Sequence, residues 1–164
     1  KDEGRVNEDA RFEDAGEAPL RLKALDAEDL SVLSALVQDA IFPGSEMRWL
    51  PQERRFALLL NRFRWEDIDA ATKRGRPVER VQSVLAVEDV MKVRSQGIDR
   101  READTILSIL AVAFTPGEDG AGTVELTLAG DGAIALDVEA LEIVLKDVTR
   151  PYIAPSQKMP DHGA

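Results

Sequence analysis

The chain of 164 residues contains no cysteine and a single histidine, His162. Without cysteine it can form no disulfide, thiolate zinc site or iron–sulfur cluster, and it has no thiol nucleophile. One histidine is too few for a histidine-based triad or a multi-histidine metal site. A glycine-rich phosphate loop leading into a helix, a Gly-x-Ser-x-Gly motif and calcium-type loop spacing are also missing. We therefore expect no metal and no cofactor.

The chain also lacks a long apolar run. The longest, from Ile106 to Phe114, is interrupted by Ser108 and is far shorter than the ~20 residues that span a bilayer. The first residues are charged and no apolar segment follows them, so no signal peptide is recognised. These features predict a soluble cytoplasmic protein that does not act at a membrane.

Basic residues are outnumbered by acidic ones, 21 to 31, and the formal net charge is -10. Such a chain repels phosphate backbones unless its basic side chains gather on one face. The only net-basic stretch, residues 46–80, mixes 9 basic with 6 acidic side chains. We therefore expect no nucleic-acid partner.

Both ends of the chain are poor in residues that build a core. Residues 1–18 are acidic and polar, and residues 151–164 contain three prolines, compositions that do not support a packed element. We interpret them as an acidic flexible tail and a proline-rich C-terminal tail, the latter anchored at Tyr152 and Ile153. Between them, residues 19–150 are long enough for a single domain.

The clearest helix signal begins at Asp26. This residue suits the N-cap position, with Asp29 at N3, and Leu25 and Leu30 occupy the two positions of a hydrophobic staple. Apolar residues continue at helical spacing, and Pro43-Gly44 ends the segment. The pattern predicts an N-terminal helix packed on a core.

Most of the remaining chain alternates apolar and polar residues with the period of two typical of strands. The run from Arg55 to Trp65 is the longest. Residues 106–115 are so apolar that a central strand buried on both faces is expected. Gly130-Asp131-Gly132 predicts a hairpin turn. The pattern predicts about seven mostly antiparallel strands, at residues 20–24, 47–49, 55–65, 81–93 with an interruption at 88–89, 106–115, 124–128 and 134–138.

Residues 141–148 fit two structures. Leu141, Val144, Leu145 and Val148 have helical spacing, which favours a C-terminal helix, although Leu141, Ile143 and Leu145 also satisfy a strand. The expected fold is therefore α+β: a strongly bent sheet or partly closed barrel with an N-terminal and a C-terminal helix. A pleckstrin-homology-like barrel, seven strands followed by a helix, is an alternative topology.

The strongest candidate binding surface is formed by Asn61, Arg62, Arg64 and Trp65. In an extended strand the two arginines continue the apolar face that begins at Phe56, so this face becomes basic at the sheet margin. Guanidinium groups beside aromatic rings can bind carboxylates or phosphates. The structural alternative places the rings in the core and lets the arginines extend to solvent. With exposed arginines, Arg62→Ala together with Arg64→Ala should leave stability nearly unchanged.

Asp89 is a second candidate, because Glu88-Asp89 interrupts a strand. Strict alternation turns Asp89 into the core, where an unpaired carboxylate is costly. Either a bulge turns it outward, or it pairs with a basic group in a structural ion pair or a binding site. If the arginines at 62 and 64 are structural, Asp89 is their expected partner. Met47 and Trp49 are interpreted as core residues and not as parts of a ligand site.

Three stretches together carry a resemblance to a known family: residues 19–30, 54–65 and 130–136, of which Arg54–Trp65 is the most specific. They resemble an uncharacterised bacterial family catalogued as domain of unknown function 2948, over roughly residues 10–155. The resemblance implies a short, cytoplasmic, single-domain protein. It assigns no activity and no functional residue.

Function therefore stays open between two classes. We expect a non-enzymatic binding or adaptor domain that uses a sheet face or edge around Asn61–Trp65, with a protein partner or a second copy of the chain. The alternative is a small-molecule-binding barrel with a carboxylate–arginine site, a class that includes enzymes. A cavity with converging polar groups favours a ligand binder, whereas an apolar patch or a free strand edge favours an adaptor.

Overall fold

The computed structural model describes residues 18–99 and 104–153. In these two segments ten strands form one sheet, accompanied by two α-helices and two 3₁₀ turns. In chain order they are β1 (Arg21–Ala24), α2 (Ala27–Leu36), β2 (Ile41–Pro43), η1 (Gly44–Glu46), β3 (Met47–Leu50), β4 (Arg55–Phe63), η2 (Trp65–Asp67), α3 (Ile68–Lys73), β5 (Arg80–Val87), β6 (Val90–Gln96), β7 (Ile106–Pro116), β8 (Gly122–Leu128), β9 (Ala133–Val138) and β10 (Ile143–Asp147).

The sheet is antiparallel throughout its described pairings, so the predicted α+β class with a mostly antiparallel sheet is confirmed. The strand order is β1-β10-β5-β4-β2-β7-β8-β9-β6, and β3 pairs with β4 beside β2. The number of strands was underestimated at seven. The three-residue β2 is too short to show alternation, β6 reverses direction after β5, and β10 has the sequence pattern of a helix.

The predicted C-terminal helix is wrong, because residues 143–147 form β10. This strand lies between β1 and β5 and pairs with both. Its buried residues alternate, with Ile143, Leu145 and Asp147 facing inward, whereas Val148, which a helix would have buried, is exposed. The local pattern fitted either structure, and the hydrogen bonds offered by two neighbouring strands decided between them.

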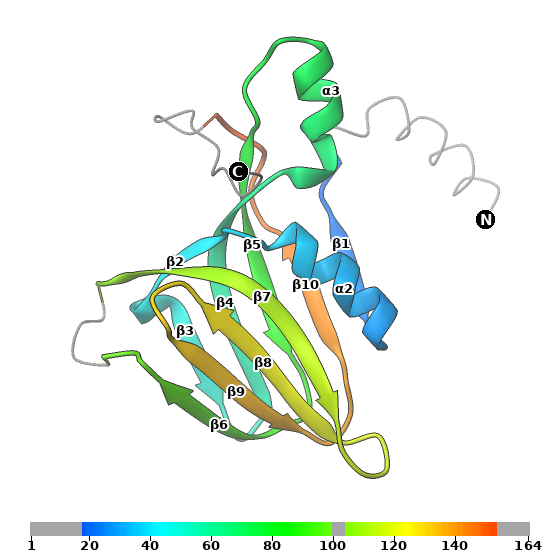
Figure 1. Ribbon diagram of the computed structural model, residues 1–164, viewed down its shortest axis with the longest axis vertical. Coiled ribbons are helices and arrows are strands. Elements are labelled where there is room, and N and C mark those ends of the chain that lie inside the picture. Colours follow the sequence, from blue (N-terminus) through cyan, green and yellow to red (C-terminus); the bar gives the residue numbers. More distant parts are fainter. Residues whose placement is uncertain (1–17, 100–103, 154–164) are drawn as a thin grey trace, which may run out of the picture.

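The sheet bends into a barrel-like wall that does not close (Figure 1). One gap in the wall, between β1 and β7, is covered by α2, which packs against both strands. The edge of β7 is satisfied there. Val112 donates its N–H to Ser34 Oγ at 2.9 Å, and Ile109 exchanges main-chain hydrogen bonds with Asp39 and Ala40. The other gap lies between β3 and β6, the two strands that end the wall on the opposite side.

The start of α2 agrees with the sequence in one respect and differs in another. Asp26 is the N-cap and accepts a hydrogen bond from the Asp29 N–H at 2.8 Å, as predicted. The hydrophobic staple is wrong, since Leu25 is 57% exposed while Leu30 is buried. The helix ends at Leu36, well before Pro43, because the chain turns there to meet β7.

The expectation that residues 106–115 are buried on both faces is also wrong. In β7, Ile109 and Val112 are buried, whereas Ile106 and Leu110 are exposed. A bulge at Leu110, which breaks the register with β8, pushes this side chain outward.

Most of the two predicted tails, residues 1–17 and 154–164, lies outside the described residues. Tyr152 does anchor the end of the described chain, because it forms an isolated antiparallel bridge with Arg80 through main-chain hydrogen bonds of 2.7 and 2.8 Å. Ile153 is exposed.

Candidate functional site

The structure brings the predicted residues Asn61, Arg62, Arg64 and Trp65 together at the end of β4, but not on a surface. Arg62 is 0% exposed and Arg64 is 1% exposed. The prediction that these guanidiniums form an accessible basic margin is therefore wrong. The carboxylates that neutralise them come both from the next few residues, Glu66 and Asp67, and from more distant ones, Glu79 and Asp147.

Arg62 is held by two carboxylates and a hydroxyl. It donates to both oxygens of Glu66 at 2.8 Å and to Asp147 Oδ1 at 3.0 Å. Its Nε contacts Ser83 Oγ at 3.1 Å, and the Phe63 carbonyl accepts at 3.1 Å. Asp147, on β10, also accepts from Ser83 Oγ and from the Leu20 N–H. Every donor of this guanidinium is thereby used inside the protein.

Burial and ion pairing shift the pKa values of Arg62 and Glu66 in opposite directions, and the combined effect of ion pairing is the larger. Burial lowers the pKa of Arg62, but hydrogen bonds and charge from Glu66 and Asp147 raise it above its ordinary value. Burial likewise raises the pKa of Glu66, and its hydrogen bonds and ion pair with Arg62 bring it below its ordinary value. Both groups are thus held in their charged forms.

The lowered pKa of Glu66 predicts that the stability of the fold decreases in acid. Because the pKa of Glu66 is lower in the folded than in the unfolded chain, its ion pair stabilises the fold above the ordinary carboxyl pKa of about 4.3, and this contribution is lost as pH falls through the folded value. Urea unfolding of wild type and Glu66→Gln over a series of pH values measures it. The stability difference should be largest at neutral pH and shrink on acidification. A difference independent of pH would contradict the assignment.

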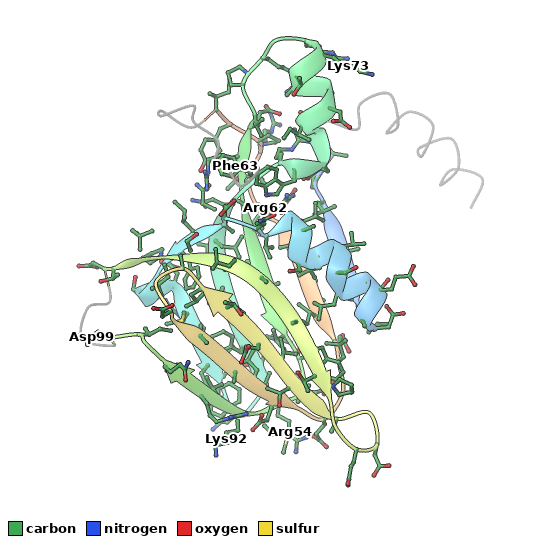
Figure 2. All side chains as sticks on the ribbon, in the orientation of Figure 1. Arg54, Arg62, Phe63, Lys73, Lys92 and Asp99 are labelled. Carbon is green, nitrogen blue, oxygen red and sulfur yellow. The ribbon has the colours of Figure 1, made fainter. Side chains whose placement is uncertain are left out.

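Arg64 is held in a second, adjoining set of ion pairs. It lies 2.6 Å from Glu79 and 3.4 Å from Asp67, and Arg76 lies 2.8 Å from the same Asp67. Asp67 belongs to the 3₁₀ turn η2, whereas Arg76 and Glu79 lie in the segment between helix α3 and β5. In Figure 2, Arg62 and Phe63 lie in the neck of the molecule below α3.

The remaining two predicted residues of this group also have intramolecular partners. Asn61 accepts a hydrogen bond from Arg80 Nε and donates to the Tyr152 hydroxyl. Trp65 Nε1 donates to the Gln38 carbonyl at 2.9 Å. Arg80 stacks over the Phe63 ring at 4.0 Å. In the described residues no buried side-chain nitrogen or oxygen lacks a hydrogen-bond partner, so this cluster is a satisfied structural network.

Asp89 lies apart from that network. It sits in the reversal between β5 and β6 with a φ of 57°, and its side chain is half-buried. Its carbonyl accepts from the Glu139 N–H at 3.0 Å. The backbone reversal, and not pairing with an arginine, thus keeps the carboxylate out of the core. The prediction that Asp89 partners Arg62 or Arg64 is wrong, because Asp147, Glu66, Glu79 and Asp67 hold those positions.

A cavity of about 550 Å³ lies in the second gap in the wall, between β3 and β6. We call it the β3–β6 cleft. Its walls are apolar toward the core and polar at the rim, a distribution typical of ligand sites. It is lined by Gly44, Met47, Trp49, Phe56, Val93, Ser95, Gly97, Ile98, Asp99, Thr105, Leu107 and Ile134.

In an antiparallel sheet, successive residues of a strand direct their main-chain N–H and C=O groups to opposite neighbours. This alternation identifies the main-chain groups of β6 that face the cleft. The Leu128 N–H donates to the Gly132 carbonyl at 2.8 Å, so Ile134 and alternate residues after it bond to β8. The β9 residues between them bond to β6, through Lys92, Arg94 and Gln96. Val93 and Ser95 therefore point their N–H and C=O groups away from β9 and toward the cleft.

The same alternation identifies the main-chain groups of β3 that face the cleft. The Arg64 N–H donates to the Glu79 carbonyl at 2.9 Å, so even-numbered residues of β4 bond to β5 and odd-numbered ones bond to β3, through Arg48 and Leu50. The main chain of Trp49 consequently faces the cleft, as its side chain does. Two strand edges thus border one cavity.

One end of the cleft is closed. The Val90 N–H, at the start of the free edge of β6, donates to the Arg54 carbonyl at 2.8 Å, and the Arg54 side chain pairs with Glu139. Beyond this contact no strand pairing joins β3 and β6 among the described residues. Arg54 and Lys92 lie at the bottom of the molecule, well below Arg62 and Phe63 in its neck (Figure 2). None of the described partners of Arg62 or Arg64 lines the cleft, so the cleft and the predicted arginine site are different places.

Sequence reasoning missed this cleft. Met47 and Trp49 were interpreted as core residues, but they are only half-buried and line the cavity. The signal available in the sequence was the weak alternation of β6. In the structure most residues of this strand are exposed, as expected of a strand at the edge of a sheet.

Residues 18–99 and 104–153 contain no group of three or more His, Asp or Glu side chains placed to hold a metal ion. No helix in those segments is long and apolar enough to cross a membrane.

Comparison with known proteins identifies the family. A family model described as protein of unknown function (DUF2948) matches residues 20–162. The chain belongs to the DUF2948 family. The resemblance found in the sequence is thereby confirmed, and the match includes both borders of the cleft. No similar curated protein and no similar solved structure was found.

Proposed function

We propose that this DUF2948 protein is a cytoplasmic, non-enzymatic binding domain and that the β3–β6 cleft is its binding site. The observation that carries the proposal is the cavity of about 550 Å³ in the gap between β3 and β6. Covering its apolar surface with a ligand releases water, and its rim offers hydroxyl and main-chain groups for orientation.

The end of β4 is not proposed as the site. Its two buried arginines are matched by Asp147, Glu66, Glu79 and Asp67, and a ligand would have to displace one of these carboxylates. Breaking a buried ion pair costs several kcal/mol. The alternative of a small-molecule site made of carboxylates and arginines therefore gains no support, whereas an apolar pocket does.

A neutral fluorescent probe tests the proposal. We expect N-phenyl-1-naphthylamine to bind one equivalent per chain and to quench Trp49, which lines the cavity. The chain has 2 tryptophans, so Trp49→Phe should remove the quenching, while Trp65→Phe, changed at the other end of β4, should keep it.

Filling the cavity provides the second arm. Val93→Phe replaces a small side chain that lines the cleft with a phenyl ring and should weaken probe binding at least tenfold. Met91→Phe, on the exposed bulge of the same strand, is the matched control and should bind as wild type does. Binding that is unaffected by Val93→Phe, or no saturable binding at all, would refute the cleft as the site.

A further inference from the structure

The two borders of the cleft are strand edges, and this constrains what kind of ligand fits. β6 ends the strand order and pairs only with β9 among the described residues, and β3 pairs only with β4. An edge presents a row of main-chain donors and acceptors that an added strand can satisfy. Val93 and Ser95 present such groups on one side, and Trp49 does so on the other.

The cavity is lined along the inner face of β6. Val93, Ser95 and Gly97 are alternate residues and all line it, so the lined stretch extends about 13 Å along the strand. An extended chain lying along β6 would project every second side chain into the apolar cavity, beside Trp49 and Phe56. Its main chain would meet the outward-facing groups of residues 93 and 95.

Three of the side chains on the outer face of the two edges are basic. Lys92 and Arg94 alternate with the cavity-lining residues of β6, and Arg48 lies between Met47 and Trp49 on β3. Asp137 pairs with Arg94 at 2.5 Å and neutralises one of these charges. The remaining positive charge favours acidic side chains on the outward positions of an added strand, because opposite charges on neighbouring strands attract.

From these observations we propose that the β3–β6 cleft binds an extended peptide segment, in which apolar and acidic residues alternate, as an additional strand beside β6. The inference rests on the proposed binding function and names its ligand. The peptide fills the gap that keeps the sheet from closing, with its apolar residues in the cavity and its acidic residues beside Lys92 and Arg48.

The test is a random octapeptide library displayed on phage and selected against the full chain. Peptides retained on wild type should show the apolar–acidic alternation. The key variant is Ser95→Pro, which removes an N–H that faces the cleft and takes no part in pairing with β9, so the ladder stays intact. Ser95→Ala keeps this N–H and is the matched control.

An enriched peptide labelled with fluorescein gives the affinities by anisotropy. We expect at least tenfold weaker binding to Ser95→Pro than to Ser95→Ala, and a similar loss for Lys92→Glu combined with Arg48→Glu. N-methylating alternate residues of the peptide, in the register that faces β6, should abolish binding to the unaltered protein. This last measurement does not depend on how any variant folds. In amide NMR spectra, residues 93 and 95 should shift on binding.

Three outcomes overturn the peptide proposal. They are failure to enrich any peptide, equal binding to Ser95→Pro and Ser95→Ala, and tolerance of N-methylation. A concentration-dependent dimer that Ser95→Pro dissolves would also overturn it, because a second copy of the chain would then occupy the edge. If naphthylamine still binds in these cases, the cleft remains a ligand site and only the peptide inference fails.

Discussion

We expect Arg62→Met to lower the free energy of unfolding by about 3–5 kcal/mol, the usual effect of removing one member of a buried ion pair. Methionine keeps the apolar length of the side chain and removes the guanidinium. Asp147, whose side chain is 3% exposed, is then left without the arginine that neutralises it. Urea unfolding at neutral pH measures the loss. This expectation reverses the small effect predicted from the sequence for replacing Arg62 and Arg64.

Arg94→Met is the matched control, because Arg94 pairs with Asp137 while both side chains remain substantially exposed. An exposed pair of this kind contributes about 0–1 kcal/mol. Adding Asp147→Asn to Arg62→Met should cost less than the two single changes summed, since the double variant removes the uncompensated charge. If Arg62→Met proved as mild as Arg94→Met, the buried network would not be a stabilising feature.

Leu33→Ala should destabilise the protein by about 2–5 kcal/mol, the usual range when a large buried aliphatic side chain is truncated and a cavity is left behind. Leu33 is fully buried in the main hydrophobic cluster, on the helix that covers the gap between β1 and β7. Its loss weakens both the core and the attachment of α2 to the wall. Thermal and urea unfolding should agree on the size of the effect.

Val32→Ala tests whether burial, and not helix propensity, is responsible. Val32 is the neighbouring residue on the same helix and is 52% exposed, so its replacement should change stability by no more than about 0.5 kcal/mol. Equal effects of the two substitutions would mean that the apolar stripe of α2 does not face the core.

Several elements were predictable because their signals are local. Asp26 begins α2 since its carboxylate satisfies a main-chain N–H three residues ahead, whatever surrounds it. The strand around Phe56, Leu58 and Leu60 was predictable because one face must be buried, which imposes a period of two. The hairpin turn before β9 follows from residues that tolerate positive φ at Gly130 and Asp131.

Other features depended on partners far away in the sequence. Residues 143–147 fit a helix or a strand, and the free edges of β1 and β5 selected the strand. Arg62 has the same local pattern whether it meets solvent or a carboxylate, and it is buried because β10 carries Asp147 to it from 85 residues away.

The sequence by itself therefore determined the family, the α+β class, the principal helix and most of the strands. Each of these rests on local propensity or on periodicity along one segment. Tertiary structure alone decided that the arginines are structural and that the cleft between β3 and β6 is the candidate site. The reason is physical: a cavity bordered by two strand edges exists only where segments distant in sequence approach without pairing. The local sequence of a strand does not show whether its edge will be paired or left free.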